Sequence, residues 1–211
     1  MRISSLSRRG GVPVATIKFY LRERLLPPGT LTARNQADYD ESHLTRIKLI
    51  RTLTGIGMMS LAAVREVLAA IDDCGVEQRE LYQVLNGALC AQQAVSTDAA
   101  AVDRARKQTD GFIEGVGWRV GDDAPGRTAL AQVVAALRDL GCSSEVADVF
   151  LPYARAAELL AARELDAMPP GAQELVTRTV LFEVAFAVMR RMAFEHLLAR
   201  RDGEGAGVTD G

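Results

Sequence analysis

The sequence predicts a mainly α-helical fold with one small β-hairpin near the N-terminus. Three observations support this prediction. Aromatic residues make up only 5% of the 211 residues, whereas alanine, leucine and valine are plentiful. Apolar residues recur at intervals of three and four along most of the chain, which is the spacing of one helix face. Proline and glycine cluster at a few places and divide the chain into separate helices.

The first part of the chain reads as two short helices separated by a turn. Residues 3–9 form the first helix, which Gly10 and Gly11 end because glycine tolerates the backbone of a tight turn. Pro13 suits the first turn of a second helix, which we expect to reach Arg24. The expected buried stripe of this second helix is Val14, Ile17 and Leu21. The side chains that fall largely off the stripe are Thr16, Lys18, Tyr20 and Arg22.

A hairpin and two further helices are expected to complete an N-terminal domain of residues 1–73. Residues 30–39 are short and polar, which predicts a small hairpin, or wing. Asp40 is a credible N-cap for a helix that begins at Glu41, and Ser60 caps the next one. The basic residues that we expect the first of these helices to expose are Arg46, Lys48 and Arg51.

Charge is distributed unevenly along the chain. Residues 1–71 contain 11 Lys/Arg and 5 Asp/Glu, whereas residues 72–211 contain 14 and 22. This asymmetry suggests a head that binds a polyanion on an acidic body. A basic helix-turn-helix with a wing would present such a head to double-stranded DNA. The alternative is an accidental bias of surface charge.

A long helix is predicted over residues 76–117. Between Glu77 and Gln108 the only breaker is Gly87, and the apolar residues trace one face. A second copy of this helix, paired in a coiled coil, is the simplest partner for that face. The alternative is a bundle helix packed on the C-terminal region.

The C-terminal part is predicted to be a helical domain over residues 127–201, followed by a disordered tail at 202–211. Pro152 lies inside one of its helices and is expected to kink or divide it. These helices could enclose an apolar cavity for a ligand, although the same aromatic side chains could simply form a core. The candidate lining residues are Trp118, Phe150, Tyr153 and Phe186.

The N-terminal third of the chain resembles the MerR family of bacterial transcriptional regulators in the order and spacing of its motifs. The matching stretches are residues 3–9, 11–20, 25–28, 39–40, 44–53, 57–61 and 64–68. More loosely, the chain resembles an actinobacterial subset with Asn35-Gln36-Ala37 in the wing and an all-helical C-terminal part.

This resemblance implies a winged helix-turn-helix followed by a dimerising helix. It also implies a homodimer that binds a promoter and, when activated, bends and untwists the spacer so that RNA polymerase can engage both promoter elements. Thr16, Lys18 and Tyr20 fall where the family's recognition helix meets DNA, with the Tyr20 hydroxyl on a phosphate. Arg22 is assigned to the same surface, and Arg34 to the wing.

The sequence departs from the family pattern at several of these positions. Lys18 replaces a common arginine and therefore lacks the bidentate fork that reads guanine. Asn35-Gln36-Ala37 replaces a Gly-Tyr-Arg run whose arginine contacts phosphate. Arg24 replaces a usual glycine, and it is either an added phosphate contact or simply exposed.

No residues form a convincing catalytic, metal or cofactor site, so we expect a protein that is not an enzyme. Cys74 lies where metal-sensing relatives place a thiolate, but no second soft donor is spaced to join it. Cys90 and Cys142 read as small core residues. His43 and His196 have no nucleophile at a motif spacing. For His43, capping, exposure and a phosphate contact all remain open.

Without a signal peptide or a bilayer-spanning apolar run, a cytoplasmic location is expected.

Two functional interpretations follow. In the first interpretation, the helical body senses a small-molecule effector and alters the angle between two DNA-binding heads. In the second, the body binds a protein partner and the head only tethers it to DNA. The first requires an enclosed cavity in the body, and the second requires an exposed apolar patch.

Overall fold

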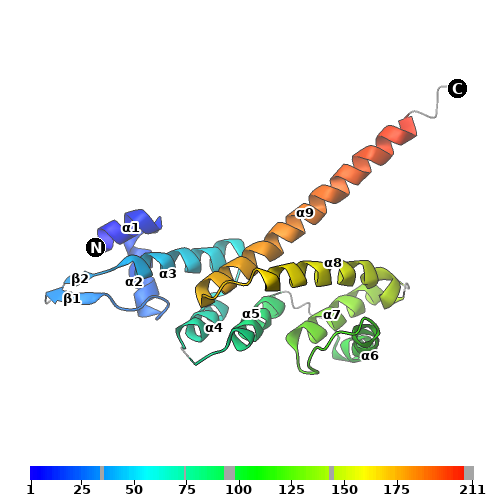
Figure 1. Cartoon of the computed structure of the whole chain (residues 1–211), viewed down its shortest axis with the longest axis horizontal. Coiled ribbons are helices and arrows are strands. Elements are labelled where there is room, and N and C mark those ends of the chain that lie inside the picture. The colour runs from blue at the N-terminus through cyan, green and yellow to red at the C-terminus, as the bar shows by residue number, and fades with distance from the viewer. Residues whose placement is uncertain (34–35, 74, 93–97, 143–144, 207–211) are drawn as a thin grey trace. The chain divides into compact units, whose positions relative to one another are not determined.

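The computed structural model of the chain describes residues 1–33, 36–73, 75–92, 98–142 and 145–206. These residues are mainly helical and contain one two-stranded antiparallel sheet (Figure 1). The predicted fold class is therefore confirmed. The chain divides into two compact units, one formed by Met1–Met58 with Gln173–Gly211 and the other by Met59–Ala172.

The first unit begins with the predicted pair of short helices. Helix α1 (Ile3–Gly10) ends at Gly11, whose φ of 65° is the left-handed conformation that glycine adopts without strain. A side chain at Gly10 would lie 3.1 Å from Ile47, so glycine lets α1 approach the helix that carries Ile47. Helix α2 (Val14–Arg22) follows, two residues shorter than predicted.

The wing is a hairpin of β1 (Thr30–Ala33) and β2 (Gln36–Asp38). Leu31 pairs with Ala37, and the register shifts between Leu31 and Ala33. The start of the chain holds the base of this hairpin, because the Tyr39 N–H donates to the Met1 carbonyl at 2.8 Å and the Met1 amino group donates to the Tyr39 carbonyl. The hairpin predicted over residues 30–39 is confirmed.

Residues Met1–Met58 of the first unit are here called the head. Helix α3 (Glu41–Arg51) and the π-helical turn η1 (Thr52–Ile56) form its centre. The fully buried side chains that pack the head are Leu6, Ile17, Leu25, Leu26, Ile47, Ile50 and Leu53. The predicted exposure of Arg46 is wrong, because this side chain is only 5% exposed and its Nε donates to the Leu25 carbonyl at 3.1 Å. A buried guanidinium here satisfies the backbone that follows α2.

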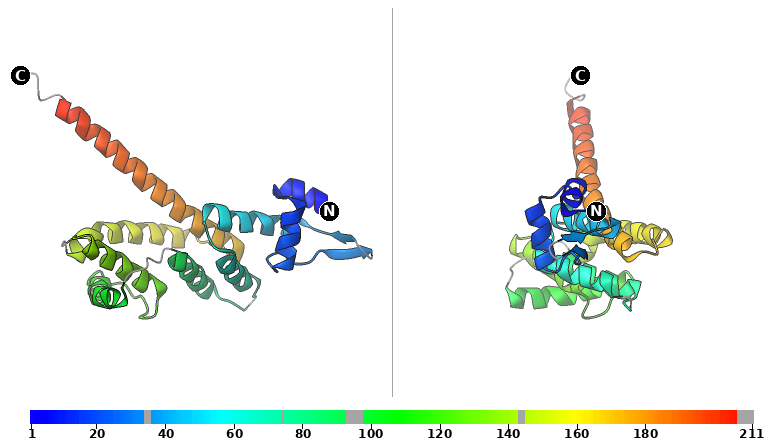
Figure 2. Two further views of the ribbon diagram at one scale, coloured as in Figure 1. Left: turned by 180° about the vertical axis from the view of Figure 1, so that it is seen from behind. Right: turned by 90° about the vertical axis from the view of Figure 1, so that its left-hand side faces the viewer.

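Helix α9 (Ala172–Ala206) is the longest helix of the described residues, with 35 residues. Its base approaches the head closely: a side chain at Gly57 would lie 2.8 Å from Val180 Cγ1. Its second half runs away from α1, α2 and α3 in every view (Figure 2). The helix continues to Ala206, so the predicted tail of 202–211 begins too early; residues 207–211 lie outside the described part.

The second unit consists of five helices within the described residues. They are α4 (Leu61–Asp72), α5 (Gln78–Gln92), α6 (Ala99–Gly115), α7 (Pro125–Asp139) and α8 (Val146–Asp166). Ser60 caps α4 as predicted, accepting from the Ala63 N–H at 3.2 Å. The core shared by α6, α7 and α8 contains Ala105, Phe112, Ile113, Ala131, Val134, Ala135, Val146 and Ala154. Pro152 does not divide α8.

The single helix predicted over residues 76–117 is wrong, because this region forms two helices. Asp98 has an extended backbone and accepts from the Ala100 N–H at 3.3 Å, which is the geometry of an N-cap and begins α6 afresh. The apolar faces are also buried separately, Leu81 and Leu85 on α5, and Phe112 on α6. The helical spacing of apolar residues in the sequence does not reveal this boundary, whereas the N-cap at Asp98 does.

A buried arginine joins α6, α7 and the segment between them. Arg127 donates to Asp110 Oδ1 at 2.7 Å and to the Val120 carbonyl at 2.7 Å. Its guanidinium lowers the pKa of the Asp110 carboxyl through this hydrogen bond. No helix of the described residues has both the length and the apolarity to cross a membrane.

Candidate nucleic-acid interface

One face of α2 exposes cationic side chains over a buried apolar face. Lys18 and Arg22 are exposed, whereas Ile17 is fully buried. Ala15, Lys18, Phe19 and Arg22 share the exposed face, because residues three and four apart lie together on a helix. Among the described residues, Lys18 has no ion-pair partner. Its ammonium is therefore available to an external anion.

Phe19 is a member of this face that the sequence prediction missed. It is half-buried, and the guanidinium of Arg22 lies 5.4 Å from the centre of its ring. This cation–π contact orients Arg22, whose Nε also lies 3.4 Å from Glu23 Oε1. The spacing of Phe19 and Arg22, three apart on one helix, is a signal that could have revealed the pair.

The predicted exposure of Tyr20 is wrong. Its side chain is only 8% exposed, on the same face as Ile17. Burial raises the pKa of the Tyr20 phenol, and the nearby positive charge of Arg51 opposes that increase. The Tyr20 carbonyl accepts from the Leu25 N–H at 2.9 Å and from the Leu26 N–H at 3.2 Å, so its carbonyl oxygen and its buried ring both fix the end of α2. Tyr20 supports this surface from beneath.

The predicted DNA contacts also include Thr16 and Arg34. Thr16 is half-buried at the edge of the exposed α2 face. Arg34 lies outside the described residues, and so does Asn35 of the wing. Gln36 and Ala37, which replace family wing residues, are part of β2.

The wing receives a cation from outside its own strands. Arg2 donates from Nη1 to Gln36 Oε1 at 2.5 Å, and its Nε lies 3.9 Å from Asp38 Oδ1. Both Arg2 and Gln36 are exposed, so this guanidinium lies at the wing surface. The sequence prediction did not include Arg2, because the pairing joins residues 34 positions apart.

The turn after α2 contains a strained residue. Arg24 has a φ of 57°, which is the left-handed region that non-glycine residues avoid. The resemblance places a glycine at this position, and the observed φ gives the physical reason for it. Arg24 is exposed at this turn.

The start of α3 is fixed by a capping network around Asp40. Asp40 accepts from the Ser42 N–H at 2.9 Å and from the His43 N–H at 3.2 Å, and His43 Nδ1 lies 2.7 Å from Asp40 Oδ1. These bonds hold the pKa of Asp40 well below its usual range, with the Ser42 hydroxyl contributing most. The Asp40 cap is confirmed. His43 is 7% exposed and serves the cap, with its ring edge-on to Tyr39.

Some cations of the head are already paired. Arg9 makes a two-pronged contact with Glu41, at 2.5 and 2.9 Å, which raises the pKa of Arg9 and lowers the pKa of Glu41. Arg51 donates to the Gly10 carbonyl at 3.0 Å. These residues position α1 against α3, whereas Lys18 is oriented by α2 alone.

The geometry agrees with two comparisons to known proteins. Residues 1–71 match the MerR HTH family of regulatory proteins. The whole fold is similar to that of SCO5550 from Streptomyces coelicolor A3(2), described as a candidate transcriptional regulator, with a TM-score of 0.68 and 35% sequence identity. That similarity covers 95% of this chain and 97% of SCO5550. Residues 1–71 therefore form a MerR-family HTH domain.

A curated relative of this chain comes from Haemophilus influenzae, where it is described as an HTH-type transcriptional regulator, ZntR homolog. The two are 29% identical over 86 residues. The match covers 41% of this chain and 63% of the relative, which is less than two thirds of the relative's length. The similarity to this relative is thus local.

The candidate ligand residues are divided between the two units of the chain. Trp118 and Phe150 pack against the core of the second unit, and Tyr153 is 49% exposed on α8. Phe186 belongs to α9 in the first unit. Two grooves of the second unit have volumes of about 270 Å³, between α6 and α7, and about 140 Å³, between α7 and α8. Both are below the range of about 300–1,000 Å³ that is usual for ligand sites.

The cysteines differ from one another in exposure. Cys142 is exposed, so its predicted place in a core is wrong, because it follows the glycine turn that ends α7. Cys90 is half-buried with its Sγ 3.6 Å from Asn86 Oδ1. Cys74 lies outside the described residues, and within the described ones no three His, Cys, Asp or Glu side chains converge as metal ligands.

Proposed function

We propose that this chain is a DNA-binding transcriptional regulator that acts as a homodimer on a promoter. The observation that carries the proposal is the exposed face of α2, where Lys18 and Arg22 stand over a rigid, buried base. The net positive charge of residues 1–71 supports the same assignment, because phosphate neutralisation provides much of the affinity of DNA-binding proteins.

The α2 face is proposed to enter the major groove. Lys18 would neutralise a phosphate or donate to a base as a point charge, and Arg22 would donate in the plane that Phe19 sets. Thr16 would flank these contacts. Arg34 remains a proposed wing contact, and Arg2 is proposed to add a second cation there. Tyr20 would contribute by holding α2 in place.

The promoter is proposed to be activated by bending and untwisting. Two heads on half-sites one or more helical turns apart can change DNA twist if the angle between them changes. An overlong spacer would then become engageable by RNA polymerase. A small-molecule effector in the helical body would shift the equilibrium between two such arrangements.

The alternative is an adaptor, in which a protein partner binds the body and DNA only tethers the complex. Exposed leucines on α8 favour this adaptor interpretation. On α8, Leu159 is 60% exposed and Leu165 is 62% exposed. Two grooves of the same unit, between α6 and α7 and between α7 and α8, are small. A body with exposed leucines and small grooves suits a protein partner better than a bulky effector.

Replacement of Lys18 by alanine tests the DNA assignment. Fluorescence anisotropy on a promoter fragment found by genomic mapping of bound sites should show weaker binding, with the slope of log affinity against log salt shallower by about 2, one phosphate for each head. Lys107→Ala is the matched control, since Lys107 is an exposed lysine on α6. Equal affinities for the two variants would overturn the assignment. Spacers of ordinary length at the mapped sites would overturn untwisting.

A further inference from the structure

We infer that an exposed apolar stripe on α9 pairs with the same stripe of a second copy of the chain. The stripe, here called the α9 stripe, consists of Phe182, Phe186, Met189, Met192, Ala193 and Leu197, all of them exposed. The inference rests on the proposed homodimer and assigns its interface to α9, in the C-terminal part of the sequence, instead of to residues 76–117.

In the described parts of residues 76–117, the main apolar faces of α5 and α6 are already buried within one chain. On α5 the side chains of Leu81, Leu85, Ala88 and Leu89 are buried within a single chain. On α6 the side chains of Ala105, Phe112 and Ile113 are buried as well. A dimer needs apolar surface that folding has not already used.

The α9 stripe has the spacing of a helix that pairs with another helix. Phe182, Phe186, Met189 and Ala193 follow one another at intervals of four, three and four residues. This alternation is the heptad pattern whose side chains fit between those of a facing helix. Met192 and Leu197 lie at its two flanks, where paired helices also make contact. With 35 residues, α9 is about 52 Å long, which is ample for such a contact.

The exposed area is of the size that a dimer needs. The exposed fractions are 40% for Phe182, 38% for Phe186, 58% for Met189, 61% for Met192 and 55% for Leu197. At roughly 200 Å² for each side chain, the stripe exposes about 500 Å² of apolar surface. A stable interface buries about 800 Å² for each partner, of which rather more than half is apolar. The stripe alone meets that apolar share.

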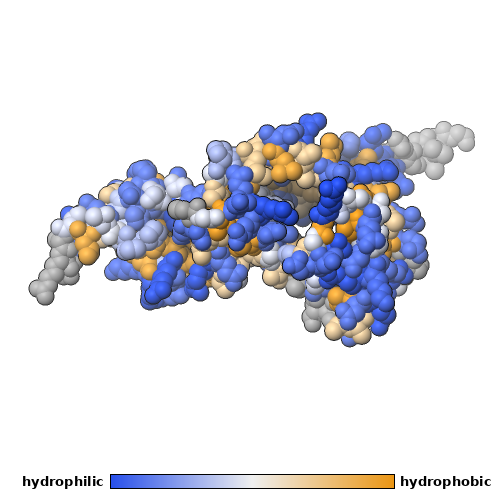
Figure 3. All heavy atoms as spheres, turned by 60° about the horizontal axis from the view of Figure 1, so that its bottom comes forward, coloured by the Kyte–Doolittle hydropathy of each residue, from blue (hydrophilic) through white to orange (hydrophobic). Residues whose placement is uncertain are grey.

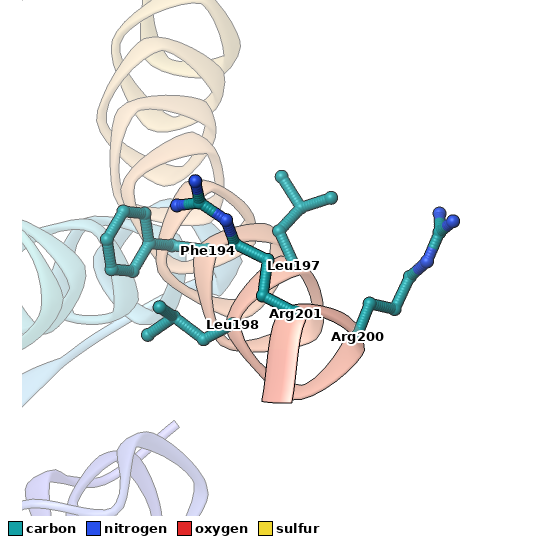
Figure 4. Close-up of a pocket in the computed structure, with 5 residues that line it drawn as sticks. All are labelled: Phe194, Leu197, Leu198, Arg200 and Arg201. Carbon is teal, nitrogen blue, oxygen red and sulfur yellow. The ribbon is translucent and has the colours of Figure 1, made fainter. Parts of the chain in front are cut away.

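The surface around the stripe is mixed in character. Toward the grey C-terminal residues, orange and blue atoms lie side by side on the face shown in Figure 3. Arginines bound the stripe, among them Arg190 and Arg201. At the end of α9, a hollow of about 420 Å³ is lined by Phe194, Leu197, Leu198, Arg200 and Arg201. Phe194 and Leu198 project from one side of the helix there, and Leu197 from another (Figure 4).

A second copy is the occupant that best fits these observations. A heptad stripe is self-complementary, so two copies related by a two-fold axis bury the same residues on both sides. The base of α9 is held on the head at Gly57 and Val180. Pairing of the two helices therefore also fixes two α2 faces relative to each other, as a reader of paired half-sites requires.

The test compares charge insertion on the stripe with charge insertion beside it. Sedimentation equilibrium of the full chain at micromolar concentration, without DNA, should show a dimer. Phe186→Glu with Met189→Glu should raise the dimer dissociation constant by at least about 100-fold, because four carboxylates would be buried without partners. Phe194→Glu with Leu198→Glu, on another side of the same helix, should leave the dimer intact. Circular dichroism should show the same helicity for all three proteins.

A second measurement covers variants that fail to fold. With Cys74, Cys90 and Cys142 replaced by serine, Met189→Cys should be joined into a covalent dimer by a short bismaleimide, whereas Leu159→Cys on α8 should not. A monomeric wild-type chain, a dimeric Phe186→Glu/Met189→Glu variant, or no cross-link at position 189 would each overturn the inference. Because these readings are taken without DNA, they leave the Lys18 test of the proposed function independent.

Discussion

Helices α2 and α9 differ in how far their apolar side chains are buried. The nine-residue α2 buries Ile17 and Tyr20 and turns Lys18 and Arg22 outward. Among the α9 side chains whose burial is described, up to Arg201, the buried ones lie near its base, such as Val176 and Val180, and aromatic and methionine side chains further along are exposed. Both helices belong to the same unit of the chain.

The difference indicates which kind of partner each helix serves. When a cation on a helix already fixed by the core meets a phosphate, the backbone of that helix loses little further entropy. An apolar stripe left in water gains free energy only when another apolar surface covers it. We therefore assign α2 to a nucleic acid and α9 to a protein.

The largest expected effect tests whether Tyr20 is truly part of the core. Tyr20→Ala should lower the free energy of unfolding by about 3–5 kcal/mol, since it removes a buried ring. On α9, Phe194→Ala should change it by no more than about 0.5 kcal/mol, because Phe194 is 61% exposed and off the α9 stripe. Urea unfolding followed by circular dichroism measures both. Equal losses would break the comparison between the two helices.

The next effect concerns the base of α9. Gly57→Ala would place a methyl group 2.8 Å from both the Leu53 carbonyl oxygen and Val180 Cγ1, and we expect a loss of about 1–3 kcal/mol in the free energy of unfolding. Gly55→Ala is the matched control, because no atom lies within 4 Å of the added carbon. It should be neutral or slightly stabilising, since alanine favours helix over glycine. A tolerated Gly57→Ala would contradict the close approach of α9.

Removal of the α3 cap should have a moderate effect that depends on pH. Asp40→Ala should lower the melting temperature by roughly 2–4 °C at neutral pH. The pKa of Asp40 is lowered on folding, so its charge stabilises the fold above the unfolded pKa of about 3.9. That stabilisation is lost as the pH falls through the lower pKa of the folded state. Thermal unfolding of wild type and variant should therefore converge in strong acid, and a constant difference would refute the role of the charge.

The sequence predicted the polarity of α2 but not which aromatic ring it buries. Helical periodicity placed Lys18 and Arg22 outward correctly. It placed Tyr20 outward as well, because Val14, Ile17 and Leu21 supplied a sufficient stripe without it. In the fold, the chain turns back after α2, the Leu25 and Leu26 N–H groups donate to the Tyr20 carbonyl, and the Tyr20 ring is buried. Such a tertiary preference is invisible in a nine-residue pattern.

The same limit explains why the sequence predicted one long helix over residues 76–117 and why it did not predict the exposed α9 stripe. Apolar spacing alone cannot tell a stripe buried in its own chain from one left exposed, so residues 76–117 looked like a dimer helix. The cap at Asp98 was readable from the sequence, since aspartate favours that position. The exposure of Phe186 and Met189 was not, because it depends on how far α9 extends beyond the head. The hairpin and the Asp40 cap were predictable because turn and cap residues act locally.

The smallest expected effect decides the role of Arg24. Arg24→Gly should raise the free energy of unfolding by about 0.5 kcal/mol, because relief of the left-handed strain exceeds the added entropy of the unfolded chain. Arg24→Ala keeps the strain and should give no gain in the same urea titration. Both variants lose the same charge. If Arg24 contacts phosphate, both should weaken DNA binding equally and make its salt slope shallower; if it is only exposed, both should bind like the wild type while differing from each other in stability. Only a phosphate contact would explain why this turn contains an arginine, because its left-handed backbone favours glycine.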